Sequence, residues 1–138
     1  MNNSAEAVSE SILGLDFKTV ILAGKAYTIH PPVISTICRA IKHFSRVETE
    51  GLDTVPKVIS KIPEIAPYLI RGLSEFIAGN SRFGKYKSFR LRRKLKNATS
   101  EELKTAMDAC VSVIGAESFF QSAALAQFMS RMAANPKS

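Results

Sequence analysis

The sequence has few of the side chains that carry most catalytic and metal-binding chemistry. Its 138 residues contain two His, two Cys and no Trp. No His, Cys or acidic residues have the spacing of a zinc or calcium site, and no Gly-rich loop joins a strand to a helix for phosphate binding. We therefore predict no catalytic residues, no metal and no cofactor. The remaining alternative is an enzyme whose catalytic triad is assembled from residues that are distant in the sequence.

The His and Cys residues have structural interpretations. His30 is expected at the end of a strand and His43 in a helix, and the sequence shows no partner for either. Cys38 and Cys110 lie far apart within apolar helix faces, where a free Cys usually serves as a small hydrophobe. We predict that both thiols are buried.

Long apolar runs are also missing. No run approaches the roughly 20 residues that cross a bilayer, and residues 1–6 lack the basic and apolar regions of a signal peptide. The length and the 46% hydrophobic content fit one globular domain. We expect a cytoplasmic protein without a membrane partner, with a domain over 17–134 between a flexible segment, 1–16, and a tail, 135–138.

The N-terminal part of this domain is predicted to be a β-hairpin over residues 17–30. Two β-rich runs flank Ala23-Gly24-Lys25, and Gly24 can adopt a positive φ. An isolated hairpin is marginally stable in water. Its apolar face must therefore pack on helices or extend another sheet.

Apolar positions at helical spacing follow the hairpin, over about 33–47, 53–62, 63–78, 88–98, 99–114 and 117–133. Pro63 is expected to separate the second and third of these segments. Gly72 would permit close packing within the third. The predicted fold class is mainly α, with about five helices packed as a single-domain bundle and one N-terminal β-hairpin.

Two of these helices have a predicted buried face. In the first, one face carries the apolar residues Val33, Ile34, Ile37, Ile41 and Phe44, and the opposite face carries Arg39, Lys42 and Arg46. The helix over 99–114 starts with Thr99-Ser100-Glu101-Glu102, which fits a capping box. Its residues Leu103, Met107, Cys110 and Ile114 are expected to be buried.

The net charge of +7 is concentrated in the basic stretch, residues 82–96. It contains no acid and eight cations: Arg82, Lys85, Lys87, Arg90, Arg92, Arg93, Lys94 and Lys96. Phe83, Tyr86 and Phe89 interleave with them. We expect the rings to enter the core and the cations to form a solvated face, so that Arg90, Arg92, Arg93 and Lys94 together are dispensable for the fold.

Two functional interpretations of the basic stretch remain open. Cations interleaved with aromatic rings are typical of surfaces that contact phosphates and stack on bases. The same cations could meet an acidic face of a protein partner. The alternative function is therefore a small basic helical protein that binds nucleic acid through residues 82–96.

The last helix is richer in large apolar residues than one neighbour can cover. Phe119, Phe120, Phe128, Met129 and Met132 are spread around most of its circumference. Met side chains adapt to irregular surfaces and recur in grooves that bind helices. We predict that these five residues bind a partner, and that the hairpin edge allows homo-oligomer formation.

Several segments together resemble a known family. They are Gly24-Lys25-Ala26-Tyr27-Thr28-Ile29, the Pro31-Pro32 step, Thr99-Ser100-Glu101-Glu102-Leu103, Ser118-Phe119-Phe120 and Asn135-Pro136-Lys137. In this order the chain resembles small tail assembly chaperones of tailed bacteriophages and prophages.

The resemblance implies a mostly helical, non-enzymatic protein in the cytoplasm of a bacterial host. Its partner would be the long, hydrophobic, helical tape measure protein, which such chaperones hold until the tail tube polymerises around it. The basic stretch departs from that family's pattern, and no residue-level binding motif carries over from it.

Overall fold

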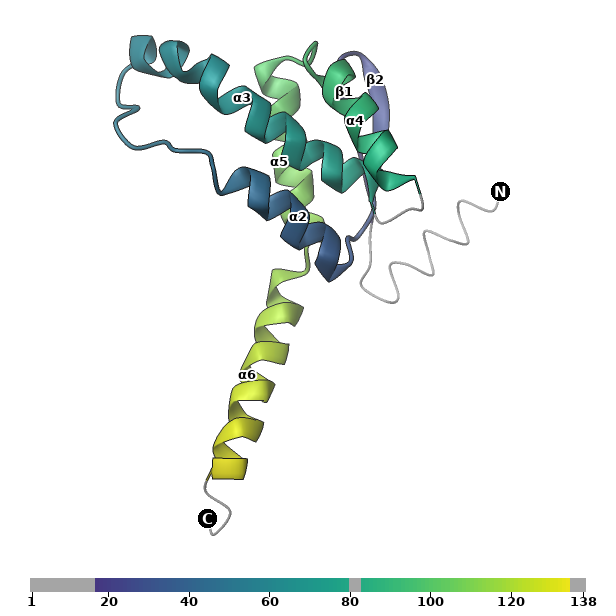
Figure 1. Cartoon of the computed structure of the whole chain (residues 1–138), viewed down its shortest axis with the longest axis vertical. Coiled ribbons are helices and arrows are strands. Elements are labelled where there is room, and N and C mark those ends of the chain that lie inside the picture. The colour runs from purple at the N-terminus through teal and green to yellow at the C-terminus, as the bar shows by residue number, and fades with distance from the viewer. Residues whose placement is uncertain (1–16, 80–82, 135–138) are drawn as a thin grey trace.

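The computed structural model describes residues 17–79 and 83–134. Its elements are strands β1 (Lys18–Leu22) and β2 (Lys25–Ile29) and helices α2 (Ile34–Phe44), α3 (Val55–Ala78), α4 (Gly84–Leu95), α5 (Ser100–Val113) and α6 (Ala116–Ala134) (Figure 1). This confirms a mainly α fold with an N-terminal hairpin. The flexible segment and tail expected at 1–16 and 135–138 lie outside the described residues, as does Arg82.

The predicted hairpin is confirmed. β1 and β2 pair antiparallel with Leu22 opposite Lys25, so the turn consists of Ala23 and Gly24. Their φ angles are 54° and 74°, and positive φ at both central residues is what a type I′ hairpin turn requires. Ala23 adopts this conformation despite its Cβ, which costs roughly 1–2 kcal/mol.

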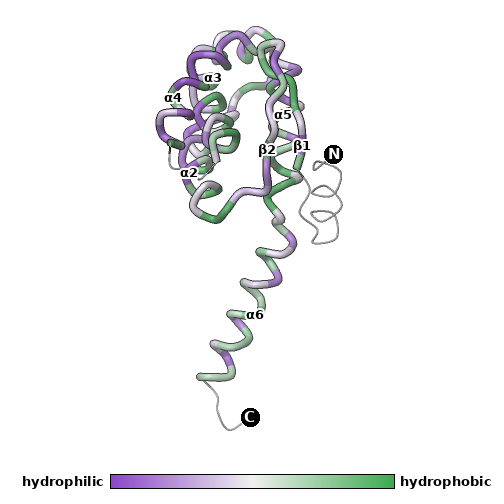
Figure 2. Tube along the Cα trace, turned by 90° about the vertical axis from the view of Figure 1, so that its right-hand side faces the viewer, coloured by the Kyte–Doolittle hydropathy of each residue, from purple (hydrophilic) through white to green (hydrophobic). Residues whose placement is uncertain are grey.

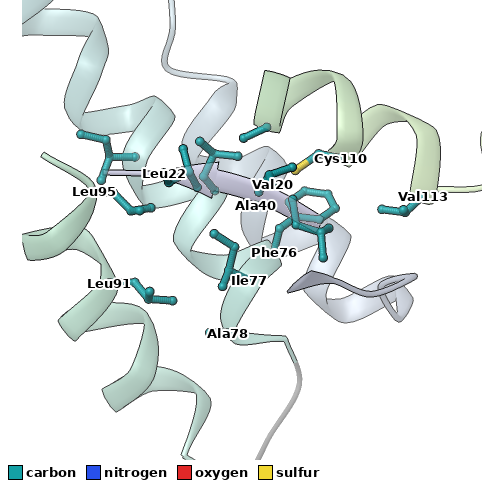
Figure 3. Packing of buried hydrophobic residues seen from close by; sticks show 14 residues of the cluster. Val20, Leu22, Ala40, Phe76, Ile77, Ala78, Leu91, Leu95, Cys110 and Val113 are labelled. Carbon is teal, nitrogen blue, oxygen red and sulfur yellow. The ribbon is translucent and has the colours of Figure 1, made fainter. Parts of the chain in front are cut away.

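The apolar face of the hairpin packs on helices, as expected. Val20, Leu22 and Ile29 are buried, whereas Ile21, on the opposite face of β1, is 56% exposed. In the core, these side chains meet residues from α3, α4 and α5 (Figure 3). The helical members of the core are Ala40, Ile70, Leu73, Phe76, Ile77, Ala78, Leu91, Leu95, Ala106, Cys110 and Val113.

The capping box at the start of α5 is confirmed, and it also holds the hairpin turn. Thr99 Oγ1 accepts from the Glu102 amide at 3.2 Å, and the Thr99 amide donates to Glu102 Oε1 at 2.8 Å. The same carboxylate accepts from the amides of Ala23 and Gly24, at 3.2 and 3.4 Å. One side chain therefore fixes the start of α5 and the turn of the hairpin relative to each other.

The break expected at Pro63 is absent, because α3 continues from Val55 to Ala78 through both Pro63 and Pro67. Each Pro lacks the N–H of a helical hydrogen bond, and an interior Pro costs roughly 3 kcal/mol. Both prolines are exposed, so water can reach the carbonyl groups left without a partner. The C-terminal half of α3, buried from Ile70 to Ala78 at most positions, supplies the packing that offsets this cost.

The buried face predicted for α2 is confirmed only in part. Thr36 and Ala40 are the buried residues, whereas Val33, Ile34 and Ile41 are about half exposed. Of the predicted face, Ile37 is half-buried and Phe44 packs against the core. The side of α2 that meets α3 is therefore offset from the apolar stripe in the sequence, and Arg39 pairs there with Glu75 of α3.

Gly72 permits close packing of α2 on α3, as predicted. A Cβ added at Gly72 would overlap the ring of Phe44. That ring also stacks on Phe76, with centroids 6.4 Å apart. The absence of a side chain at Gly72 therefore positions the C-terminal end of α2.

The burial expected along α5 and for the thiols is confirmed only in part. Cys110 is buried, and its burial raises the pKa of its thiol to about 12. Leu103, Met107 and Ile114 are half-buried at the margin of the core, and Cys38 is exposed. The amphipathic pattern predicted the correct face of α5. It did not predict how completely the neighbouring elements cover that face.

Glu102 gives a prediction about pH. The amides of Thr99, Gly24 and Ala23 hold the pKa of this carboxyl below its ordinary value of 4.5. Its contribution to stability is therefore fully present above that value and is lost as the pH falls through the lower, folded-state pKa. The melting temperature of the wild type should fall between about pH 7 and pH 3, partly because Glu102 becomes protonated. In Glu102→Gln this part of the fall should be absent.

Glu101→Gln is the matched control, since Glu101 is exposed on the same first turn. It removes one charge and leaves the amide contacts of Glu102 in place. If the two variants have identical melting curves across this range, Glu102 does not hold the turn in solution.

Candidate partner-binding surfaces

A second carboxylate, Glu75, joins α2, α3 and α4, and α4 carries most of the basic stretch. Glu75 of α3, with a side chain only 14% exposed, contacts Arg39 Nε at 3.2 Å and Arg92 Nη2 at 3.5 Å. Ser88 Oγ donates to its Oε1 at 3.4 Å. Because Arg39 lies on α2 and Arg92 on α4, Glu75 holds both helices against α3.

His43 of α2 also faces Glu75, with Nε2 at 3.8 Å from Oε1. Burial lowers the pKa of His43, and the nearby charge of Arg92 lowers it further, against the opposing effect of Glu75. The imidazole is therefore neutral at pH 7. The sequence showed no partner for His43, and the structure corrects this, although the contact is structural and suggests no catalytic role.

The basic stretch folds differently from the expectation. Helix α4 begins at Gly84, before the Ser88 start that the sequence suggested, and Ser88 is buried against Glu75. Phe83, Tyr86 and Phe89 are 71%, 64% and 59% exposed, so the prediction that they enter the core was wrong. The buried residues of α4 are Ser88, Leu91 and Leu95, and the three rings do not share that buried side.

The structure separates the predicted cations into two groups. Arg92 is half-buried and paired with Glu75, and its Nε is a buried nitrogen without a hydrogen-bond partner among the described residues. The other six described cations are exposed: Lys85, Lys87, Arg90, Arg93, Lys94 and Lys96. The expected solvated face therefore exists, but Arg92 does not belong to it.

Helix α6 extends away from the rest of the chain, and none of its residues is buried (Figures 1 and 2). Gly115, with φ 70°, ends α5 and allows this change of direction. All five residues predicted to bind a partner are exposed: Phe119 60%, Phe120 72%, Phe128 61%, Met129 67% and Met132 58%. The structure thus leaves their side chains without contacts to the core.

The N-terminal half of α3 is a second exposed apolar surface, which the sequence reasoning missed. Val55, Val58, Ile59 and Ile62 are 71%, 43%, 59% and 49% exposed. The sequence does indicate a continuous helix here, because apolar residues at helical spacing continue on both sides of Pro63. The prediction instead placed two helices, over 53–62 and 63–78, and gave no reason to expect an exposed apolar surface.

Two grooves flank this half of α3, and Ile62 and Ala66 line both. The α3–α5 groove is almost wholly apolar and encloses about 290 Å³; it is lined by Val58, Ile62, Ile65, Ala66, Leu69, Ser100, Leu103, Lys104 and Met107. The α3–α4 groove encloses about 620 Å³; it is lined by Ile62, Pro63, Ala66, Pro67, Ile70, Arg71, Phe89, Arg92, Arg93 and Lys96.

One stretch of the described chain, Ser100–Ala134, contains an 18-residue window apolar enough for a membrane span, with a mean hydropathy of 1.3. This stretch comprises α5 and α6, which Ile114 and Gly115 separate. The sequence reasoning had found no such run. Within residues 17–79 and 83–134, no three His, Cys, Asp or Glu side chains are grouped to hold a metal ion.

Comparisons with protein-family models, with curated proteins and with solved structures find no match to this chain.

The two groups of cations predict different effects on stability. The triple variant Arg90→Gln/Arg93→Gln/Lys94→Gln should unfold at the same denaturant concentration as the wild type or a higher one, because it only reduces repulsion between exposed charges. Adding Arg92→Gln should cost on the order of 1–2 kcal/mol. This is below the roughly 3–5 kcal/mol for breaking a fully buried pair, because Arg92 remains 32% exposed.

Urea denaturation of the wild type, the triple variant and the quadruple variant measures this difference. Equal midpoints for the triple and quadruple variants would show that the contact between Arg92 and Glu75 contributes nothing measurable.

Proposed function

We propose that this protein is a non-enzymatic chaperone that binds apolar helical segments of a partner protein, as a tail assembly chaperone binds the tape measure protein. The observation that carries the proposal is the complete exposure of α6. A soluble helix normally buries one apolar side, whereas α6 exposes three Phe and two Met residues around its circumference. Exposed apolar surface of this kind is characteristic of protein-binding sites.

The composition of α6 suits a tolerant binding surface. Met129 and Met132 have flexible, polarizable side chains that adapt to partners of different shape. Glu117 and Arg131 are the charged residues of the helix, so its binding is expected to depend little on a particular charge pattern. A long helical partner offers many similar segments, and several weak contacts along it add up through multivalency.

Exposed apolar surface on the body supports the same proposal. The N-terminal half of α3 and its flanking grooves lie beside helices that hold the fold together. A partner helix could therefore occupy a groove without disturbing the core, which is the helix-in-groove mode of recognition. The hairpin, whose outer strand edges pair with no other strand among the described residues, remains the proposed contact between copies of the chain.

Nucleic-acid binding by the basic stretch remains the second candidate. The exposure of Tyr86 and Phe89 beside Lys85, Lys87 and Arg90 favours it, because stacking on bases requires accessible rings. Salt separates the two functions. Binding to nucleic acid should weaken steeply with added salt through counterion release, whereas binding of an apolar helix should persist.

The test of the proposed function is co-expression with helical fragments of a tape measure protein, followed by size-exclusion chromatography in low and high salt. The wild type should elute with a fragment at both salt concentrations. Phe128→Asp/Met132→Asp should abolish co-elution, because it places two charges in the apolar surface of α6. Its melting temperature should be unchanged, since α6 contributes no buried residue.

Ser122→Asp/Ser130→Asp is the control, because it adds the same charge to exposed polar positions of the same helix. A wild-type protein that solubilises no fragment, yet retains DNA at low salt and releases it at high salt, would contradict the chaperone proposal and support nucleic-acid binding.

A further inference from the structure

The α3–α4 groove combines an apolar floor with a cationic rim. Ile62, Pro63, Ala66, Pro67 and Ile70 of α3 supply aliphatic surface, and Phe89 of α4 adds an exposed ring. Arg71, Arg92, Arg93 and Lys96 supply four cations, and none of the described residues that line the groove is Asp or Glu. At about 620 Å³ its volume falls within the roughly 300–1,000 Å³ of ligand sites.

The cations of the rim have little local compensation. Glu75, the carboxylate that contacts Arg92, is already shared with Arg39, His43 and Ser88. Arg92 therefore uses only some of its five N–H donors in the contact with Glu75, and its Nε has no hydrogen-bond partner among the described residues. Arg93 and Lys96 are exposed beside it. A ligand with carboxylates along one side would find three adjacent cations.

We infer that the α3–α4 groove binds an amphipathic helix of a partner protein, whose apolar side packs on α3 and whose acidic flank pairs with Arg93, Lys96 and Arg71. Charge complementarity selects the acidic flank, because Arg71, Arg93 and Lys96 have no ion pair among the described residues and Arg92 shares its carboxylate, Glu75, with Arg39 and His43. The groove offers five apolar residues of α3 and one ring, Phe89, so most of its apolar surface suits the apolar side of a protein helix rather than a series of stacked bases.

This inference rests on the proposed function and refines it by naming the chemistry of the partner. Helix α6 would bind apolar segments with little charge selectivity, whereas the groove would select those with Asp or Glu beside the apolar side. Charged residues at the edge of an interface act mainly on specificity and on the rate of association. The groove thus determines which segments are bound preferentially.

The experiment uses the full chain and two designed peptides with the same Leu-based apolar face, one flanked by Glu and one by Lys. Fluorescence anisotropy measures their dissociation constants at low and moderate salt. The wild type should bind the Glu-flanked peptide about tenfold more tightly than the Lys-flanked one, or about 1.4 kcal/mol. Arg93→Glu/Lys96→Glu should remove or invert this preference.

Lys87→Glu/Lys94→Glu is the matched control, because it changes the net charge equally at exposed positions of α4 that do not line the groove. It should retain most of the preference. Equal effects of the two double variants would show a response to net charge alone and would overturn the inference.

A third probe, a 20-nucleotide single-stranded DNA, tests the other class of ligand. If the DNA displaces the Glu-flanked peptide and binds more tightly than it does, the groove is a nucleic-acid surface and the inference is wrong. The Phe128→Asp/Met132→Asp variant separates the two proposals. If this variant loses peptide binding and Arg93→Glu/Lys96→Glu has no effect, α6 alone binds the peptide. If Arg93→Glu/Lys96→Glu changes peptide binding and this variant does not, the groove alone binds it.

Discussion

The arrangement of the helices depends on one carboxylate that is almost removed from solvent. Glu75 on α3 pairs with Arg39 of α2 and Arg92 of α4, and it accepts from Ser88 (Figure 1 shows the three helices side by side). Burying a carboxylate without such partners would be strongly unfavourable. The pairings therefore fix which side of α2 faces inward and which cation of α4 is withdrawn from the basic surface.

Glu102 has the equivalent role at the other side of the core. Its carboxylate accepts from amides at the start of α5 and in the hairpin turn, so it holds two segments that are distant in sequence. Among the described residues, the core draws its members from the hairpin, α2, α3, α4 and α5, and α6 contributes none. The apolar residues of α6 and of the N-terminal half of α3 therefore lie outside this core.

The sequence predicted features that depend on local chemistry. The hairpin, the capping box at Thr99 and the fold class follow from turn residues, caps and apolar periodicity. Features set by distant residues were predicted wrongly. The inward face of α2 involves contacts with Glu75 and Gly72 of α3, and the continuity of α3 through Pro63 depends on packing of its C-terminal half. The exposure of Tyr86 and Phe89 depends on which side of α4 faces the core. Among the candidate sites, the apolar residues of α6 were predicted, whereas neither groove beside α3 could be derived without the positions of α4 and α5.

We propose that a partner protein covers the exposed helix α6. Amide hydrogen exchange of the protein alone and in complex with a helical tape measure fragment tests this most directly. We expect rapid exchange over residues 116–134 in the free protein, strong protection of the same residues in the complex, and unchanged slow exchange in β1, α5 and the buried half of α3. Protection of α6 in the free protein, or a stable complex in which α6 still exchanges rapidly, would contradict the proposal.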